Sequence, residues 1–299
     1  MKTKIILAIL IMLLGLSIWL NGCPGHNPSF AKEKKEKTPK GLKTKTEIDY
    51  EFVEKSGKYE KVLESKTIYK YDSNGNQIEE TDYDADGKLK DKFFPKYDDK
   101  DNLIEWVRYD ADGKLTNTLL FKYDDRGNKI EEAGYDADGK LKDKYLSKYD
   151  DKGNQIDGAS YGADGTLEEK SLYKYDDRNN LIEIIVNDSD GKLIHKYLGK
   201  YDDKGNMIEQ AYYDTDDKLK DKYLYKYDNK NNPIDKAGYD ADGKLTDKWL
   251  CKYDDKDNLI DEIQYKYNLE EKSGQVQEVP LSQTVYEYEV YPEPKNGGK

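Results

Sequence analysis

Residues 123–148 read YDDRGNKIEEAGYDADGKLKDKYLSK, and close copies of this 26-residue stretch recur along a chain of 299 residues. A fixed period of this kind is typical of repeat proteins, in which each copy forms one small structural unit. Because stacked units grow in one dimension, we expect an extended surface rather than a single globular core. Eight tyrosines open the copies: Tyr71, Tyr97, Tyr123, Tyr149, Tyr175, Tyr201, Tyr227 and Tyr253.

Each copy contains two turn signals. Asp follows the opening tyrosine in all eight copies, and three residues later stands Gly, Asn or Asp, the residue types that tolerate a left-handed backbone. The second signal, YDADGKL, also places Asp near the start of the turn and Gly at its end. Both signals favour three-residue hairpin loops with a type I turn and a G1 bulge, at 151–153 and 137–139. Two turns per copy predict two strands per copy.

The turns also predict a strand register. They pair Asp150 with Asn154, Tyr149 with Gln155, and Tyr135 with Leu141. When the pairings at the two turns of a repeat are added, equivalent residues slip by two positions per repeat, which should coil the sheet. Since side chains alternate along a strand, this register predicts an aromatic face and a lysine-rich face. The aromatic face is expected to collect Tyr135, Leu141, Tyr145 and Tyr149 with Ala133, and the second face Lys140, Lys142, Lys144, Lys148, Leu146 and Ile156.

The predicted fold is all-β: a long antiparallel β-meander of repeated hairpins forming a coiled or curled sheet. Residues 50–71 resemble 265–288, so both ends are interpreted as caps, and Pro280, Pro292 and Pro294 are expected to protect an open edge. The predicted organisation is a signal peptide at 1–22, an acylated cysteine and lysine-rich tether at 23–46, N-terminal capping strands at 47–68, eight repeats at 69–264, and C-terminal capping strands and tail at 265–299.

The N-terminus carries an export signal. Two lysines precede an apolar run from Ile5 to Leu20, a pattern typical of signal peptides. The run ends in Leu20-Asn21-Gly22-Cys23, which resembles the lipobox of bacterial lipoproteins, in which the cysteine becomes the acylated mature N-terminus, carrying chains such as palmitate. The resemblance implies lipidation of Cys23 and a protein anchored at the bacterial cell envelope, on the periplasmic face or the cell surface. Alternatives are a plain signal peptide or a single spanning anchor.

The repeat itself resembles a known family. Tyr-Asp-x-x-Gly-Asn and Tyr-Asp-Ala-Asp-Gly-Lys-Leu, over about 69–264, are similar to the YD-repeat (RHS-type) proteins. In larger members such hairpin repeats wind into a β-sheet shell around a toxic C-terminal cargo. The resemblance implies a hairpin-repeat shell here as well, and one alternative is a relative of toxin-delivery systems that lacks the toxin.

Charge and composition exclude several classes of function. The formal net charge is −12, which disfavours nucleic acid as a partner because phosphate binding needs a basic surface. The chain has two histidines, His26 and His195, and shows neither a Ser/His/Asp or Cys/His arrangement nor a Gly-rich phosphate loop. We therefore expect a protein that is not an enzyme. Cys251 occupies a repeat position that is mostly aromatic elsewhere and is expected to be a small apolar filler.

Calcium is a weak candidate ligand. Asp82, Asp84 and Asp86 match the start of an EF-hand loop, but Phe93 stands where the bidentate Glu is needed. The carboxylates are explained better by turn formation. Calcium aside, we expect no cofactor.

Three functions remain open. The first is a non-enzymatic, membrane-anchored binding or scaffold surface for envelope polysaccharide or a surface protein, with the eight opening tyrosines as candidate ligand-stacking residues. The second is a structural spacer without a ligand, in which those rings form the core of a sheet short of aliphatic residues. The third is a calcium-dependent adhesion module.

Overall fold

A computed structural model describes residues 41–269 and 276–292. All regular structure in these residues is β, in eighteen strands. They are β1 (Leu42–Lys55), β2 (Lys58–Tyr71), β3 (Gln77–Asp84), β4 (Leu89–Tyr97), β5 (Leu103–Asp110), β6 (Leu115–Tyr123), β7 (Lys129–Asp136), β8 (Leu141–Tyr149), β9 (Gln155–Gly162), β10 (Leu167–Tyr175), β11 (Leu181–Asp188), β12 (Leu193–Tyr201), β13 (Met207–Tyr213), β14 (Leu219–Tyr227), β15 (Pro233–Asp240), β16 (Leu245–Tyr253), β17 (Leu259–Leu269) and β18 (Val276–Val290).

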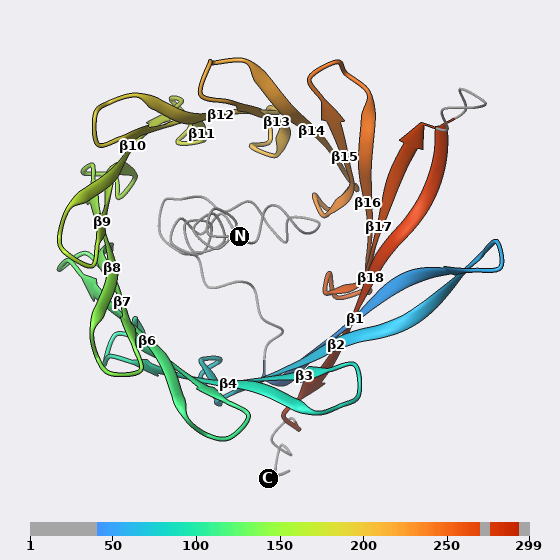
Figure 1. Ribbon diagram of the computed structural model, residues 1–299, viewed down its shortest axis with the longest axis horizontal. Helices are drawn as coiled ribbons and strands as arrows, with labels where there is room; N and C mark the ends of the chain where they lie inside the picture. Colours follow the sequence, from blue (N-terminus) through green and yellow to red (C-terminus); the bar gives the residue numbers. More distant parts are fainter. Residues whose placement is uncertain (1–40, 270–275, 293–299) are drawn as a thin grey trace, which may run out of the picture.

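The strands form an antiparallel meander that closes into a barrel (Figure 1). Each strand pairs with the next, and β18 pairs with β1 from Val290 opposite Leu42 to Ser282 opposite Glu51. The prediction of an all-β meander with two strands per repeat is confirmed, but the coiled or curled open sheet is wrong in this detail. The terminal hairpins expected as caps pair with each other instead, because closure satisfies the backbone groups that an edge would expose.

The first strand begins earlier than expected. Residues 42–46, assigned to the tether from their lysines, belong to β1. The signal peptide, Cys23, the tether up to residue 40 and residues 270–275 and 293–299 lie outside the described residues. Within the described part of the chain, no helix is long and apolar enough to cross a membrane.

The predicted turns are present in each repeat. In the loop after β8, the Asp150 amide donates to the Asn154 carbonyl at 2.8 Å, and the Gly153 amide donates to the Asp150 carbonyl at 3.1 Å. Gly153 has a φ of +85°, where an L side chain is strained. Asn179 takes the same left-handed conformation in the next copy, at +68°. This tolerance explains why Gly, Asn and Asp alternate at this position.

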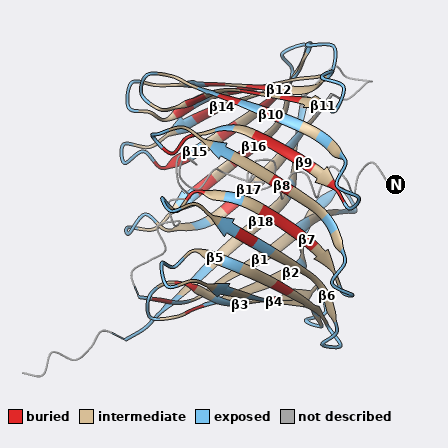
Figure 2. Ribbon diagram, turned by 90° about the vertical axis from the view of Figure 1, so that its left-hand side faces the viewer, coloured by how far each residue is buried: buried red, intermediate tan, exposed pale blue. Residues whose placement is uncertain are grey.

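The two-residue slip is also confirmed. Ala133 on β7 lies opposite Lys144 on β8, which lies opposite Tyr161 on β9. Tyr161 is 28 residues beyond Ala133, whereas the repeat is 26 residues long, so equivalent residues are offset by two from one repeat to the next. A steady offset inclines the strands to the barrel axis, as Figure 2 shows.

The predicted faces are wrong for part of each hairpin. Beyond each turn the outgoing strand carries one further bulge: Lys142 lies between Leu141, opposite Tyr135, and Asp143, opposite Gly134. Ile156 is the equivalent extra residue after the next turn. A one-residue insertion reverses the alternation beyond it. Ala133 and Tyr135 therefore share a face with Lys144 and not with Tyr145.

The two faces of the wall can be assigned to the inside and outside of the barrel. The face with Tyr145, Tyr173, Tyr197 and Trp249 is the more buried, at 3–6% exposure. On the other face, the equivalent aliphatic residues reach 37% at Leu120 and 46% at Leu172. Side chains converge on the concave side of a closed sheet and spread on the convex side. We name the first the inner face and the second the outer face.

The main apolar cluster lies on the inner face of β10 to β14. Its buried members are Tyr173, Leu181, Ile184, Val186, Tyr197, Met207 and Tyr225. Further tyrosines pack against this cluster, including Tyr212, whose ring meets that of Tyr197 edge to face at 5.7 Å. Tyrosine rings therefore share the core with a small number of aliphatic side chains and methionine.

Candidate functional site

The opening tyrosines, predicted to stack a ligand, have a structural use. Tyr71, the first of them, is 8% exposed. In later copies the hydroxyl donates to a backbone carbonyl at the start of the preceding strand in the sheet, at 2.7–3.0 Å. The pairs are Tyr123 with Leu103, Tyr149 with Lys129, Tyr175 with Gln155, Tyr201 with Leu181, Tyr227 with Met207, and Tyr253 with Pro233. Tyr97 makes the corresponding bond to the backbone of Gln77. These hydroxyls are committed to the wall.

The three aspartates considered for calcium serve different purposes. Asp84 accepts the amides of Asp86 and Lys88 at 3.0 and 2.9 Å and so stabilises its own turn. Asp82 accepts a hydrogen bond from the hydroxyl of Thr67 on β2 at 2.8 Å. Asp86 is exposed in the turn. Among the described residues, no group of three or more His, Cys, Asp or Glu side chains is arranged to hold a metal ion.

The inner face near the closure is rich in carboxylates. Glu80 on β3 is largely buried, and this burial raises its pKa to about 7, helped by the negative charges of Asp82 and Glu47 and opposed by Gln77 and Lys45. Burial also raises the pKa of Tyr69, whose hydroxyl donates to Glu47 at 3.2 Å. This part of the wall therefore binds protons more readily than free carboxylates do.

A buried lysine lies further along the inner face. Lys236 on β15 is 1% exposed, and its Nζ lies 4.3 Å from the ring centre of Trp249 and 4.8 Å from that of Tyr223. Burial lowers its pKa to about 8, although Glu262 and Asp247 favour the charged form. The two rings stabilise the ammonium group, so Lys236 belongs to the packed wall.

Cys251 is buried beside Trp249, as expected of a filler at its repeat position. The other cysteine of the chain is Cys23, which lies outside the described residues.

The outer face is covered with ion pairs. In every repeat the lysine before the opening tyrosine pairs with an acidic residue on the next strand. The pairs are Lys70–Glu79, Lys96–Glu105, Lys122–Glu131, Lys148–Asp157, Lys174–Glu183, Lys200–Glu209, Lys226–Asp235 and Lys252–Asp261. A second set of lysines lies over outer-face tyrosines, such as Lys196 over Tyr213 at 4.5 Å.

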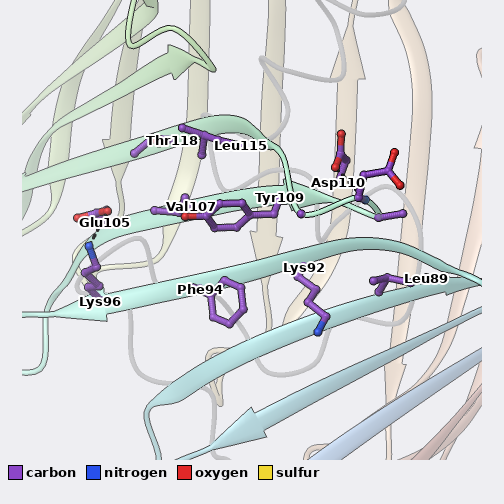
Figure 3. Close-up of a pocket in the computed structure, with 13 residues that line it drawn as sticks. Leu89, Lys92, Phe94, Lys96, Glu105, Val107, Tyr109, Asp110, Leu115 and Thr118 are labelled. Carbon is purple, nitrogen blue, oxygen red and sulfur yellow. Dashed lines mark hydrogen bonds and ion pairs between the residues drawn. The ribbon is translucent and has the colours of Figure 1, made fainter.

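One groove of about 720 Å³ interrupts this charged surface on β4, β5 and β6. Val107, which is 8% exposed, lies between Phe94 and Thr118 in the sheet register. The rings of Phe94 and Tyr109 meet edge to face at 5.9 Å. Figure 3 shows these side chains on the side of the wall turned to the viewer, with the opposite wall of the barrel behind them. Leu89 and Leu115 line the apolar groove, and the turn with Asp110 and Asp112 closes one end.

Sequence reasoning missed this groove, although a signal was present. Six copies have lysine 21 residues after the opening tyrosine, whereas Thr118 stands there in the second copy and Gly274 in the eighth. Two positions later six copies have leucine, whereas the first has Phe94 and the eighth Val276. These departures from the repeat, rather than its fixed residues, locate the groove.

Comparisons with known proteins leave the family open. No family model matches the chain, and no curated protein matches it. Among solved structures, a porin-like protein from Bacteroides uniformis ATCC 8492 is 14% identical over 84% of this chain and 98% of that chain, with a TM-score of 0.48. The TcdB2-TccC3 structure without its hypervariable C-terminal region is 13% identical over 81% of this chain and 16% of that one, with a TM-score of 0.32. Likenesses this remote carry no argument on function.

Proposed function

We propose that this chain is a non-enzymatic protein of the bacterial cell envelope, anchored through Cys23, whose barrel offers an outer binding surface to envelope polysaccharide. The observation that carries the proposal is the apolar groove with exposed aromatic edges, on an outer face that carries an ion pair in every repeat and scattered exposed aliphatic residues such as Leu172. Envelope location and lipid anchoring rest on the signal peptide and lipobox.

The outer wall supports a position in water beside the membrane. Transmembrane barrels present an apolar band to lipid, whereas this wall presents a pair of opposite charges in each repeat, such as Lys122 with Glu131. The described chain enters the barrel at one rim: Gly41 accepts a hydrogen bond from the Tyr291 amide at 2.7 Å, and the Tyr291 hydroxyl donates to the carbonyl of Tyr71 at 2.8 Å. An anchor that precedes Gly41 would therefore hold the barrel by this rim.

The groove suits a sugar ring better than a catalytic reaction. The edge-to-face rings of Phe94 and Tyr109 offer flat apolar surface, and Thr118 offers a hydroxyl beside it. Binding sites of this kind combine mostly apolar walls with a few polar groups that fix orientation. The eight opening tyrosines, with their hydroxyls turned into the wall, are weaker candidates for the same task.

Retention on polysaccharide tests the proposal. Full-length protein, solubilised in detergent, would be passed over immobilised cell-wall and capsular polysaccharides at micromolar concentration. We expect retention that Phe94→Ala lowers and that Leu172→Ala preserves, because Leu172 is an exposed outer-face residue far from the groove in the sheet. Failure of the wild-type protein to bind any of these polymers would instead favour a spacer without ligand, which a closed wall with internally bonded tyrosines would serve equally well.

A further inference from the structure

The outer face repeats one row of three residues across neighbouring strands. One such row is Leu120, from the second copy, followed by Ala133 and Lys144 from the third, each opposite the next in the sheet. The same order of an aliphatic residue, a residue on the following strand and a lysine recurs in six rows of this kind. They are Ile68–Thr81–Lys92, Leu120–Ala133–Lys144, Leu146–Ala159–Lys170, Leu172–Ile185–Lys196, Leu198–Ala211–Lys222 and Leu224–Ala237–Lys248.

The groove occupies a row that departs from this rule, Phe94–Val107–Thr118. A second such row, Leu250–Ile263–Gln283, lies beside the closure and ends in glutamine. A lysine at the third position has a long aliphatic stem that can lie along neighbouring apolar surface. Thr118 is too short to do so, and Phe94 adds a ring on the other side of Val107. The groove therefore follows from two substitutions within the repeated pattern.

The charges around the groove disfavour an anionic ligand. Lys96 is paired with Glu105 at 2.8 Å, and Lys92 is near enough to Glu79 to contribute to the lowered pKa of that carboxyl. Asp110 and Asp112 add negative charge at the closed end. Two lysines and three carboxylates (Glu105, Asp110 and Asp112) line the groove, so a polymer with carboxylates or phosphates would meet a net negative charge.

We infer that Thr118 is the specificity-determining residue of the barrel: by leaving out the lysine of the repeat, it opens one groove that takes the apolar face of an uncharged sugar ring. This inference rests on the proposed function and adds the position, the number and the charge class of the sites. The six rows given above each carry a lysine at the third position, and the row beside the closure carries Gln283 there, so we expect one ligand segment to bind per barrel.

Full-length protein in detergent would be titrated with a soluble neutral β-glucan and with the carboxymethylated form of the same polymer. We expect the neutral glucan to bind at least about tenfold more tightly, a difference of about 1.4 kcal/mol. Thr118→Lys should weaken that binding at least about tenfold, while Thr118→Ser preserves it. Because lysine stands at this position in six of the other rows, Thr118→Lys is compatible with the fold, which thermal unfolding would confirm.

A variant designed to gain a second glucan-binding groove is the second test of the inference. The triple variant Leu120→Phe, Ala133→Val, Lys144→Thr should create a second groove in the next row and raise the number of glucan segments bound per barrel from one to two. Unchanged affinity in Thr118→Lys, or equal binding of the two polymers, would overturn the inference while leaving the proposed function intact. Absence of binding by wild-type protein to either polymer would overturn the inference, and the retention assay on cell-wall and capsular polymers then decides the proposed function separately.

Discussion

The hydroxyl of Tyr149, at the end of β8, donates a hydrogen bond to the backbone carbonyl oxygen of Lys129, 2.7 Å away at the start of the neighbouring strand β7. Tyr149→Phe removes the donor and keeps the ring, so we expect a loss of about 1 kcal/mol in the free energy of unfolding. Denaturant unfolding would measure it. Tyr135→Phe, on the outer face, is the control and should change stability little. A Tyr149→Phe protein of full stability that no longer binds glycan would restore the opening tyrosines as ligand-stacking residues.

The turn aspartates predict a loss of stability in acid. Asp150 accepts the amides of Lys152 and Asn154 at 2.9 and 2.8 Å and the side-chain amide of Asn154 at 3.0 Å. Burial alone would raise the pKa of Asp150, but these hydrogen bonds outweigh it and lower the pKa. The contribution of Asp150 to the free energy of unfolding is therefore present above the ordinary carboxyl pKa. It is lost as pH falls through the lowered pKa of this group in the folded protein.

Asp150→Ala should lower the free energy of unfolding at neutral pH by about 1–2 kcal/mol, through loss of bonds to a charged acceptor. Asp151→Ala is the matched control, since that neighbouring side chain is fully exposed, and it should stay within about 0.5 kcal/mol. Equal effects of the two substitutions in chemical denaturation would argue against the role of Asp150 in the turn.

The turns and the slip could be predicted because they depend on local chemistry. The Asp, Asn and Gly residues around 150–154 fix the hairpin loop, and adding the two loops of a repeat gives the offset. The faces could not be predicted, because the bulges at Lys142 and Ile156 carry no residue signature and each reverses the side-chain alternation.

Closure was beyond local reasoning for a different reason. It requires β1 to meet β18 in register after the slip has accumulated over all the intervening strands. The groove is different again, since Thr118 and Phe94 are visible in an alignment of the repeats. The fixed tyrosines, predicted as ligand-stacking residues, serve the wall, and the two residues that vary line the groove.

Glu80 predicts a pH dependence of opposite sign to that of Asp150. Its pKa is about 7 in the folded protein because of burial, above that of a free glutamate, so the folded state binds the proton more tightly between the two values. Stability from this group falls as pH rises toward and beyond 7. Glu80→Gln should therefore raise the melting temperature at pH 8 and flatten the dependence between pH 5 and 8. A variant with the same pH profile as wild type would contradict the raised pKa.

Lipid attachment at Cys23 can be tested together with the state of Cys251. A lipid on the sulfur of Cys23 and a disulfide from Cys251 to that same sulfur exclude each other in one chain. We expect intact-mass measurement of protein from a bacterial membrane fraction to show cleavage before Cys23 and added acyl mass, with Cys251 open to thiol alkylation after unfolding. Cys23→Ser should lose the lipid and leave the membrane fraction. An unlipidated Cys23 bonded to Cys251 would overturn the anchor.

The pairing of β1 with β18 predicts that the stability of the whole barrel depends on these terminal strands. Ile48 lies at the centre of β1, opposite Val285 on one side and Lys66 on the other. Ile48→Pro removes an amide donor from an interior strand and should destabilise the barrel by about 3 kcal/mol or more, exposing strand edges that aggregate. Lys55→Pro, at the end of β1 beyond its pairing with β18, is the control. Size-exclusion chromatography and circular dichroism would compare the two variants. A monomeric, fully folded Ile48→Pro protein would show that the barrel does not need the pairing of β1 with β18.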